Sequence, residues 1–110
     1  VTYRSSVEKI FRALSDPSRR RLLDVLYRRD GRTVTQLDAA LPKVTRFATM
    51  KHLRILEEAG LLTTRRVGQK KLHYLNPVPI RLIHDRWISK FAEPVIGTLS
   101  RLKSALEEDQ

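Results

Sequence analysis

The residues best suited to a chemical task lie in one stretch, TRFATMKHLRILEEAG, at positions 45–60. At about 100° per residue, one side of the helix that it predicts is apolar and suited to a core. The opposite side mixes cations with two large apolar side chains: Arg46, Phe47, Met50, Lys51 and Arg54. A solvated helix seldom exposes a phenylalanine and a methionine among cations. This side is therefore expected to contact something anionic that also has apolar edges.

The charge of the chain points to the same kind of partner. Its 110 residues include 22 Lys and Arg against 12 Asp and Glu, which gives a formal net charge of +10. Such a balance favours an anionic polymer or surface, although basic ribosomal and membrane-surface proteins share it. More than half of the excess lies between positions 43 and 71.

Several classes of protein are disfavoured by what the sequence lacks. It contains no cysteine, which excludes disulfides and thiolate metal sites. It has no run of about 18 apolar residues and no leading signal pattern, so we expect a soluble, cytoplasmic protein. No P-loop, dinucleotide glycine pattern or Ser-His-Asp set is present, so we expect no enzyme.

Two helices are expected before residue 30. Ser5 with Glu8 is typical of a capping box, and the apolar spacing that follows predicts a helix from about Ser6 to Ser15. Asp16 and Pro17 then suit the cap and the first position of a second helix.

A short third helix is expected next. Thr33 and Val34 can form a short strand, after which Thr35 with Asp38 predicts the cap of a brief helix that Pro42 ends. The helix at 45–59 is then the fourth.

Residues 62–75 predict a β-hairpin with a basic tip. Leu62 and Thr64 fall on the first strand, and Leu72 and Tyr74 fall on the second. The polar and basic side chains expected to meet phosphates are Arg65, Arg66, Gln69, Lys70 and Lys71. The same charges are also typical of a hairpin edge that deters aggregation.

A long amphipathic helix is expected at the end of the chain, over residues 79–107, with a kink at Pro94. Its apolar stripe consists of Ile80, Ile83, Trp87, Phe91, Val95, Leu99, Leu102 and Leu106. The stripe either packs on its own subunit or covers a partner surface such as a second copy of the chain.

This order of elements is that of a winged helix-turn-helix with an added terminal helix, mainly α with a small β-hairpin, in a single domain over residues 1–110. In that arrangement the helix at 45–59 enters the major groove of DNA and the hairpin at 62–75 lies along phosphates. The cations of the helix then reach guanine edges or phosphates, and its Phe and Met press on thymine methyl groups.

Three ordered motifs resemble those of the ArsR/SmtB family of bacterial repressors. ALSDPSRRRLLDVL is similar to the signature of that family's second helix, MKHLRILEEAGLL to the end of its recognition helix, and RRVGQKKLHYLNPVPI to the wing and exit of a cysteine-free branch. The likeness extends from about Ile10 to Leu106. It implies a homodimer that sits on a palindromic operator in double-stranded DNA near a promoter and represses it until an effector binds.

The resemblance further implies that the first and last helices form the dimer interface. The residues expected there are Val7, Phe11, Ile83, Trp87, Phe91, Val95, Leu99 and Leu102. Metal sensing is not implied, because the family's Cys-x-Cys pattern is replaced by VTQLDAALP and its metal site on the last helix is reduced to the adjacent His84 and Asp85. We therefore expect no metal and no other cofactor.

Some alternatives stay open. The chain can instead be a winged-helix module that binds nucleic acid non-specifically or mediates protein interaction. Phe47 and Met50 argue against this, because a phosphate-only binder does not need apolar groups on that face. His52 is expected to pack or to contact a phosphate, and Arg19–Arg21 either reach the DNA backbone, stay solvated or pair with acids such as Asp24.

Overall fold

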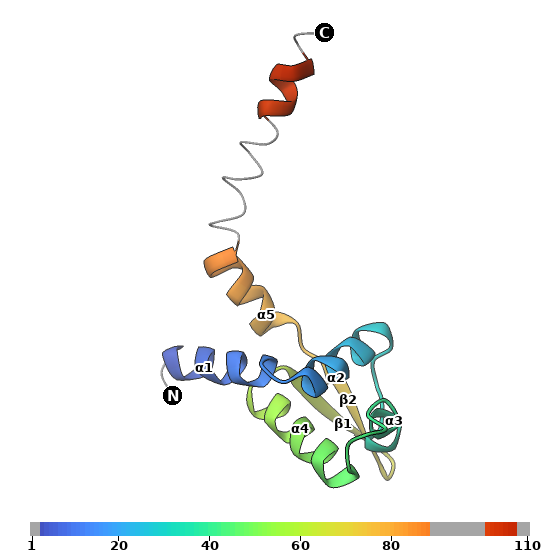
Figure 1. Cartoon of the computed structure of the whole chain (residues 1–110). Helices are drawn as coiled ribbons and strands as arrows, with labels where there is room; N and C mark the ends of the chain where they lie inside the picture. Colours follow the sequence, from blue (N-terminus) through green and yellow to red (C-terminus); the bar gives the residue numbers. More distant parts are fainter. Residues whose placement is uncertain (1–2, 89–100, 108–110) are drawn as a thin grey trace. The chain divides into compact units, whose positions relative to one another are not determined.

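The computed structural model describes residues 3–88 and 101–107 of the chain (Figure 1). In chain order the elements are α1 (Tyr3–Leu14), α2 (Pro17–Arg28), α3 (Val34–Ala39), α4 (Arg46–Glu58), β1 (Leu62–Val67), β2 (Lys70–Leu75) and α5 (Val78–Ile83). A π-helical turn, His84–Ile88, follows α5, and residues 101–107 are α-helical. The predicted fold class, mainly α with a small β-hairpin, is confirmed.

The chain divides into two compact units, residues 1–79 and 80–110. The core of the first unit is built from leucines of α2, α3, α4 and the segment that enters β1. Those with fully buried side chains are Leu22, Leu26, Leu37, Leu56 and Leu61. Truncating one of them to alanine should cost about 2–5 kcal/mol. The single domain over residues 1–110 stays a prediction.

The predicted start is correct for α2 but not for α1. Asp16 caps α2 as predicted, because its Oδ1 accepts the backbone N–H groups of Ser18 at 2.8 Å and Arg19 at 3.2 Å. The capping box predicted at Ser5 is wrong, since α1 begins at Tyr3 and Ser5 lies inside it. A Ser-x-x-Glu spacing occurs in helix interiors as well as at helix starts, so it does not fix the start of α1. Asp16 is followed by a proline, which is disfavoured inside a helix but suits its first position, so the start of α2 is well defined.

The start of α3 is set by Thr33, and the predicted cap at Thr35 is wrong. Thr33 Oγ1 accepts the N–H of Gln36 at 3.3 Å, and Gln36 Oε1 accepts the N–H of Thr33 at 2.9 Å. Asp38 is left to accept the hydroxyl of Thr49 on α4 at 2.7 Å. The strand expected at Thr33 and Val34 is also wrong, because this capping box commits both residues to the helix start.

Helix α4 begins and ends as the sequence predicts. Thr45 Oγ1 accepts the N–H of Ala48 at 3.1 Å and caps the helix. Gly60 then adopts a φ of +77°, and the N–H of Leu61 reaches back to the carbonyl of Leu56 at 3.0 Å. This is the Schellman ending, which needs a residue in the left-handed region and therefore favours glycine.

The hairpin forms as predicted, with β1 and β2 antiparallel and Gly68 in the turn at a φ of +62°. On β2, the residues that face the core are not those that the alternating pattern predicted. Leu62 pairs with Leu75 and Thr64 with His73, and residues paired across an antiparallel ladder share a face. His73, which is 3% exposed, therefore faces the interior in place of Leu72 or Tyr74.

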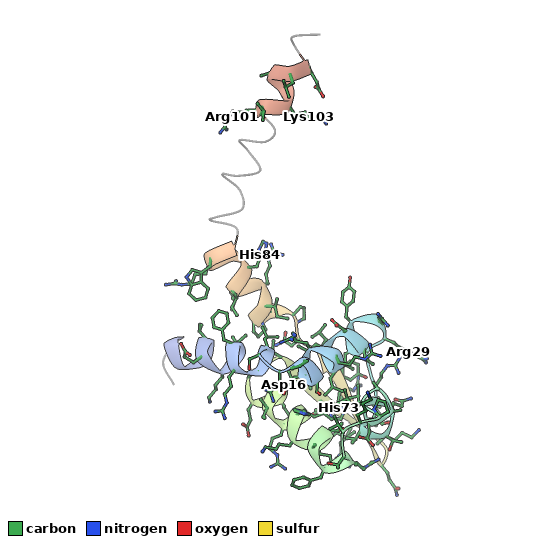
Figure 2. The ribbon with its side chains drawn as sticks, in the orientation of Figure 1. Asp16, Arg29, His73, His84, Arg101 and Lys103 are labelled. Atoms are coloured by element: carbon green, nitrogen blue, oxygen red, sulfur yellow. The ribbon has the colours of Figure 1, made fainter. Side chains whose placement is uncertain are left out.

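The base of the hairpin is fastened to the loop between α2 and α3. His73 Nδ1 and its backbone N–H both lie within 2.9 Å of the carbonyl oxygen of Arg32, and Asp30 Oδ1 accepts the N–H of Leu75 at 2.8 Å. His73 lies in the interior of this unit (Figure 2). These bonds satisfy the polar groups that the buried histidine brings into the core.

The long terminal helix predicted over residues 79–107 is described in two parts, α5 with its π-helical turn and residues 101–107. The positions of Phe91, Val95, Leu99 and the kink at Pro94 lie outside the described residues.

Candidate nucleic-acid interface

Helix α4 has the two sides that its sequence predicts. Thr49, Leu53 and Leu56 are buried against the core. On the opposite side Phe47 is 80% exposed and Met50 is 48% exposed, and the cations Arg46, Lys51 and Arg54 are exposed as well. Large apolar side chains among exposed cations indicate a contact surface that also meets apolar groups.

Arg46 stands apart from the other cations of α4. Its Nη2 donates to Thr35 Oγ1 on α3 at 3.2 Å. Together with the first residues of α3 and with Gln69, Lys70 and Lys71 of the hairpin, it lines an open hollow of about 450 Å³. Figure 1 shows α3, the first turns of α4 and the hairpin turn on the same side of the first unit.

The hairpin presents a basic edge beside this hollow. Arg65, Arg66, Gln69 and Lys70 are all exposed, as is Val67 at the turn. Lys71 differs from them, because its Nζ lies 3.9 Å from Glu57 Oε2 near the end of α4. Glu57 thus forms an exposed ion pair with one of the cations assigned to the hairpin edge.

Side chains of α4 also meet the base of the hairpin directly. Met50, Leu53 and Arg54 line a small cavity of about 170 Å³ together with Val34, Glu57, Lys71 and His73. These residues bring the exposed face of α4 next to the base of the hairpin.

His52 and His73 both have hydrogen-bonding partners within the first unit. His52 Nδ1 lies 3.2 Å from Nη1 of Arg19, a buried arginine that the sequence suggested as a solvated or backbone-contacting residue. His73 is bonded to Arg32. Among residues 3–88 and 101–107, no group of three or more His, Asp or Glu side chains is arranged to hold a metal ion.

Asp16 is the carboxylate at the junction of α1 and α2 (Figure 2). Burial acts to raise the pKa of Asp16, but hydrogen bonds from the N–H groups of Arg19 and Ser18 and the charge of Arg19 act in the opposite direction. Together they hold the pKa below its ordinary value, so Asp16 caps α2 as a carboxylate.

The residues predicted at a dimer interface fall in both units. On α1, Phe11 is 45% exposed and Val7 is half-buried. Ile83 and Trp87 are half-buried, and Leu102 is 56% exposed. Phe91, Val95 and Leu99 lie outside the described residues. Within the part of the chain that the structure describes, no helix has the length and apolar character needed to cross a membrane.

Comparisons with known proteins agree with this architecture. The family described as a helix-turn-helix domain matches residues 14–65. The HTH-type transcriptional regulator YuzN of Bacillus subtilis (strain 168) is 37% identical over 86 residues, which cover 74% of this chain and 94% of the relative.

Solved structures show the same fold. An ArsR family transcriptional regulator is 30% identical, with a TM-score of 0.69 over 84% of this chain and 93% of its own. A homodimeric winged helix-turn-helix DNA-binding domain from Mycobacterium bovis, a possible ArsR-family regulator, is 19% identical, with a TM-score of 0.61 over 80% of this chain and 86% of its own. The chain belongs to the ArsR family of winged helix-turn-helix DNA-binding transcriptional regulators.

Proposed function

We propose that the chain is a homodimeric repressor that binds a palindromic operator, with α4 in the major groove and the β1–β2 hairpin as the wing. The observation that supports this most directly is the exposed face of α4. Phe47 and Met50 stand there among cations and outside the core. A major groove offers both of the matching features, thymine methyl groups and the acceptors of guanine.

The side chains of α4 divide into base readers and a backbone contact. Met50, Phe47, Lys51 and Arg54 project from the exposed face and are assigned to base edges, with the two cations also within the reach of phosphates. Arg46 is assigned to the DNA backbone, because its bond to Thr35 turns it toward α3 and the hollow beside the hairpin. Contacts to phosphates orient a protein on the duplex but do not read sequence.

The wing is assigned to phosphates alone. Arg65, Arg66, Gln69 and Lys70 are exposed along its edge and supply charge and hydrogen-bond donors. Lys71 is expected to contribute less than its neighbours, since its charge is shared with Glu57.

Exposed apolar residues outside the DNA-facing surface support the proposed assembly as a homodimer. Phe11, Leu102 and Leu106 are 45–60% exposed, and a relative of the same fold is homodimeric. A two-fold dimer presents two copies of α4, so its operator has matching half-sites about one helical turn apart. Bound near a promoter, such a dimer represses by occupying the site, and an effector that weakens binding ends the repression.

The experiment that tests this proposal is selection of bound fragments from genomic DNA by the purified protein, followed by footprinting. A palindromic footprint upstream of a gene, with lower reporter expression when the protein is present, is the expected result. Fragments without shared sequence would favour the alternative, a module that binds nucleic acid non-specifically. A shared sequence with raised reporter expression would replace the repressor with an activator.

A further inference from the structure

Arg19 joins three helices at one buried point. The side chain is 9% exposed although it is charged. Its Nε donates to the carbonyl oxygen of Ala13 at 2.8 Å, and its Nη2 donates to that of Arg12 at 3.0 Å, both at the end of α1. Its Nη1 lies 3.2 Å from Nδ1 of His52, in the middle of α4. The guanidinium thus ties the end of α1 to the recognition helix from a position in the first turn of α2.

The contact with His52 has a chemical requirement. A guanidinium has five N–H donors and no acceptor, so Nδ1 of His52 must offer a lone pair. This contact therefore requires a neutral imidazole, with its proton on Nε2. When His52 takes up a proton, both ring nitrogens become donors, and an N–H group faces the N–H of Arg19.

The charged groups around the ring act in opposite directions. Arg19 disfavours a second positive charge beside it, whereas the carboxylate of Asp16 at the start of α2 favours one. From α1 the neighbouring groups are the carbonyls of Arg12 and Ala13, which are occupied by Arg19. The contact between Arg19 and His52 therefore depends on whether the ring carries one proton or two.

The link joins two elements with different tasks. Helix α1 packs against both α2 and α4, and it bears Phe11 and Val7 of the proposed dimer interface. Helix α4 bears the proposed base readers, with Lys51 adjacent to His52 in sequence. The orientation of α4 relative to α1 therefore decides whether two recognition helices of a dimer meet two half-sites together.

We infer that Arg19 and His52 are positioning residues that hold α4 against α1, and that protonation of His52 opens this link and weakens operator binding. The inference rests on the proposed function, in that α4 reads the operator and α1 belongs to the dimer interface. It extends that function by making operator affinity sensitive to acid.

The sign of the effect separates this inference from a simple charge effect. A histidine that gained a proton and acted only as another cation near DNA would strengthen binding at low pH, because it would add to the attraction of phosphates. Opening of the link instead weakens binding at low pH.

The test is operator binding by the full-length protein from pH 8 to pH 5.5, with the duplex found by genomic selection. Wild-type affinity is expected to fall by roughly tenfold across this range, the size expected when a hydrogen bond to a charged donor is lost. The matched control is His52→Asn, whose side-chain oxygen takes the place of Nδ1 and accepts from Arg19 without titrating. This variant should bind as the wild type does at pH 8 and should keep that affinity at pH 5.5.

A parallel fall in both proteins would overturn the inference, since His73 or His84 would then be responsible. A rise in wild-type affinity at low pH would also overturn it. Imidazole ¹⁵N spectra of the free protein test the link without DNA: at pH 8, Nδ1 of His52 should be unprotonated and Nε2 protonated. The opposite tautomer would refute the link itself, whereas absence of any selected operator would refute the proposed function and leave the spectra as the test.

Discussion

Arg46 and Lys51 are both exposed cations of α4, but the proposed function assigns them different tasks because their surroundings differ. Arg46 is turned toward Thr35 on α3, beside the hollow that Lys70 also lines. Lys51 lies on the side of α4 opposite to Leu53 and Leu56, with Phe47 and Met50 nearby in sequence. The distinction between backbone contact and base reading follows from these neighbours, since residue type does not separate an arginine that reads guanine from one that binds phosphate.

The first prediction compares alanine substitutions of these two residues. Lys51→Ala should cost about 1–3 kcal/mol on the operator and much less on a scrambled duplex, because a lost base contact removes discrimination. Arg46→Ala should weaken binding to both duplexes alike, because a phosphate is present in every sequence. Equilibrium binding of each variant to the two duplexes at one salt concentration measures the difference. Equal losses for Lys51→Ala on both duplexes would remove base reading from this position.

The second prediction concerns Asp16 as the cap of α2. Asp16→Ala should lower the free energy of unfolding at pH 7 by about 1 kcal/mol, because two backbone N–H groups lose their acceptor. Asp16→Asn should lose less, since an amide oxygen can still accept.

The same residue should give a pH dependence of defined sign. The pKa of Asp16 is lower in the folded protein than its ordinary value of about 3.9. Its contribution is therefore complete above the unfolded pKa and is lost as the pH falls through the folded pKa. Urea unfolding followed by circular dichroism should show the advantage over Asp16→Asn at pH 6 shrinking below pH 4. An advantage that stayed constant down to pH 2.5 would contradict the assigned pKa shift.

Much of α4 and the cap of α2 could be predicted from residue types, but the partners of buried polar residues could not. The Schellman ending at Gly60 and the cap at Asp16 depend on neighbours within five residues, so the local sequence is sufficient. Arg19 bonds to residues in α1 and to His52 in α4, contacts that exist only after the helices pack. The one sequence signal for a buried Arg19 is its position in the apolar repeat of α2. This signal is hard to recognise because Arg20 and Arg21 follow directly.

At the scale of elements, the hairpin has exposed charged residues toward its turn and a buried end next to the loop between α2 and α3. Pairing with the loop between α2 and α3 and the bonds of His73 fix where the strands leave the core. The sequence predicted the hairpin over residues 62–75 and its basic tip. It did not predict which face of β2 is buried, because both Leu72 and His73 are compatible with a half-buried strand and the pairing with Arg32 decides between them.

The third prediction compares cations along the wing. Arg66→Ala and Lys70→Ala should each weaken binding to operator and scrambled duplexes alike, and each should reduce the slope of log affinity against log salt by about 0.9. Lys71→Ala serves as the matched control from the same strand and should change both quantities less, because Glu57 already partly neutralises its charge. Binding measured between 50 and 300 mM salt checks the slopes. A Lys71 variant as defective as the Lys70 variant would show that the ion pair with Glu57 opens on DNA.

For the whole molecule, the proposed dimer turns two modest DNA contacts into one strong one. A single α4 and wing offer few base contacts, and a second copy held at the right spacing binds as an intramolecular event with a high effective concentration. Sequence patterns indicated apolar stripes on the first and last helices but not how each stripe divides between its own subunit and a partner. That division depends on packing between elements far apart in the chain.

The last prediction tests whether the apolar stripe at the end of the chain forms the dimer interface. Leu102 is 56% exposed, so a Leu102→Glu substitution removes little core packing within the chain. If Leu102 lies at the dimer interface, the new carboxylate becomes buried against apolar groups on dimerisation, which is strongly unfavourable. Light scattering should then report a monomer at micromolar concentration, and operator affinity should fall by roughly 100-fold or more as the second half-site contact is lost.

Ser104→Glu supplies the matched control, since Ser104 is exposed on the same helical segment and outside the stripe. It introduces the same charge and should leave both the dimer and operator binding intact. Circular dichroism melting of the two variants separates loss of assembly from loss of folding, because Leu102→Glu should retain the helical signal of the first unit. A Leu102→Glu protein that stays dimeric and binds its operator normally would move the interface to other residues, with Phe11 and Val7 of α1 the next to be substituted.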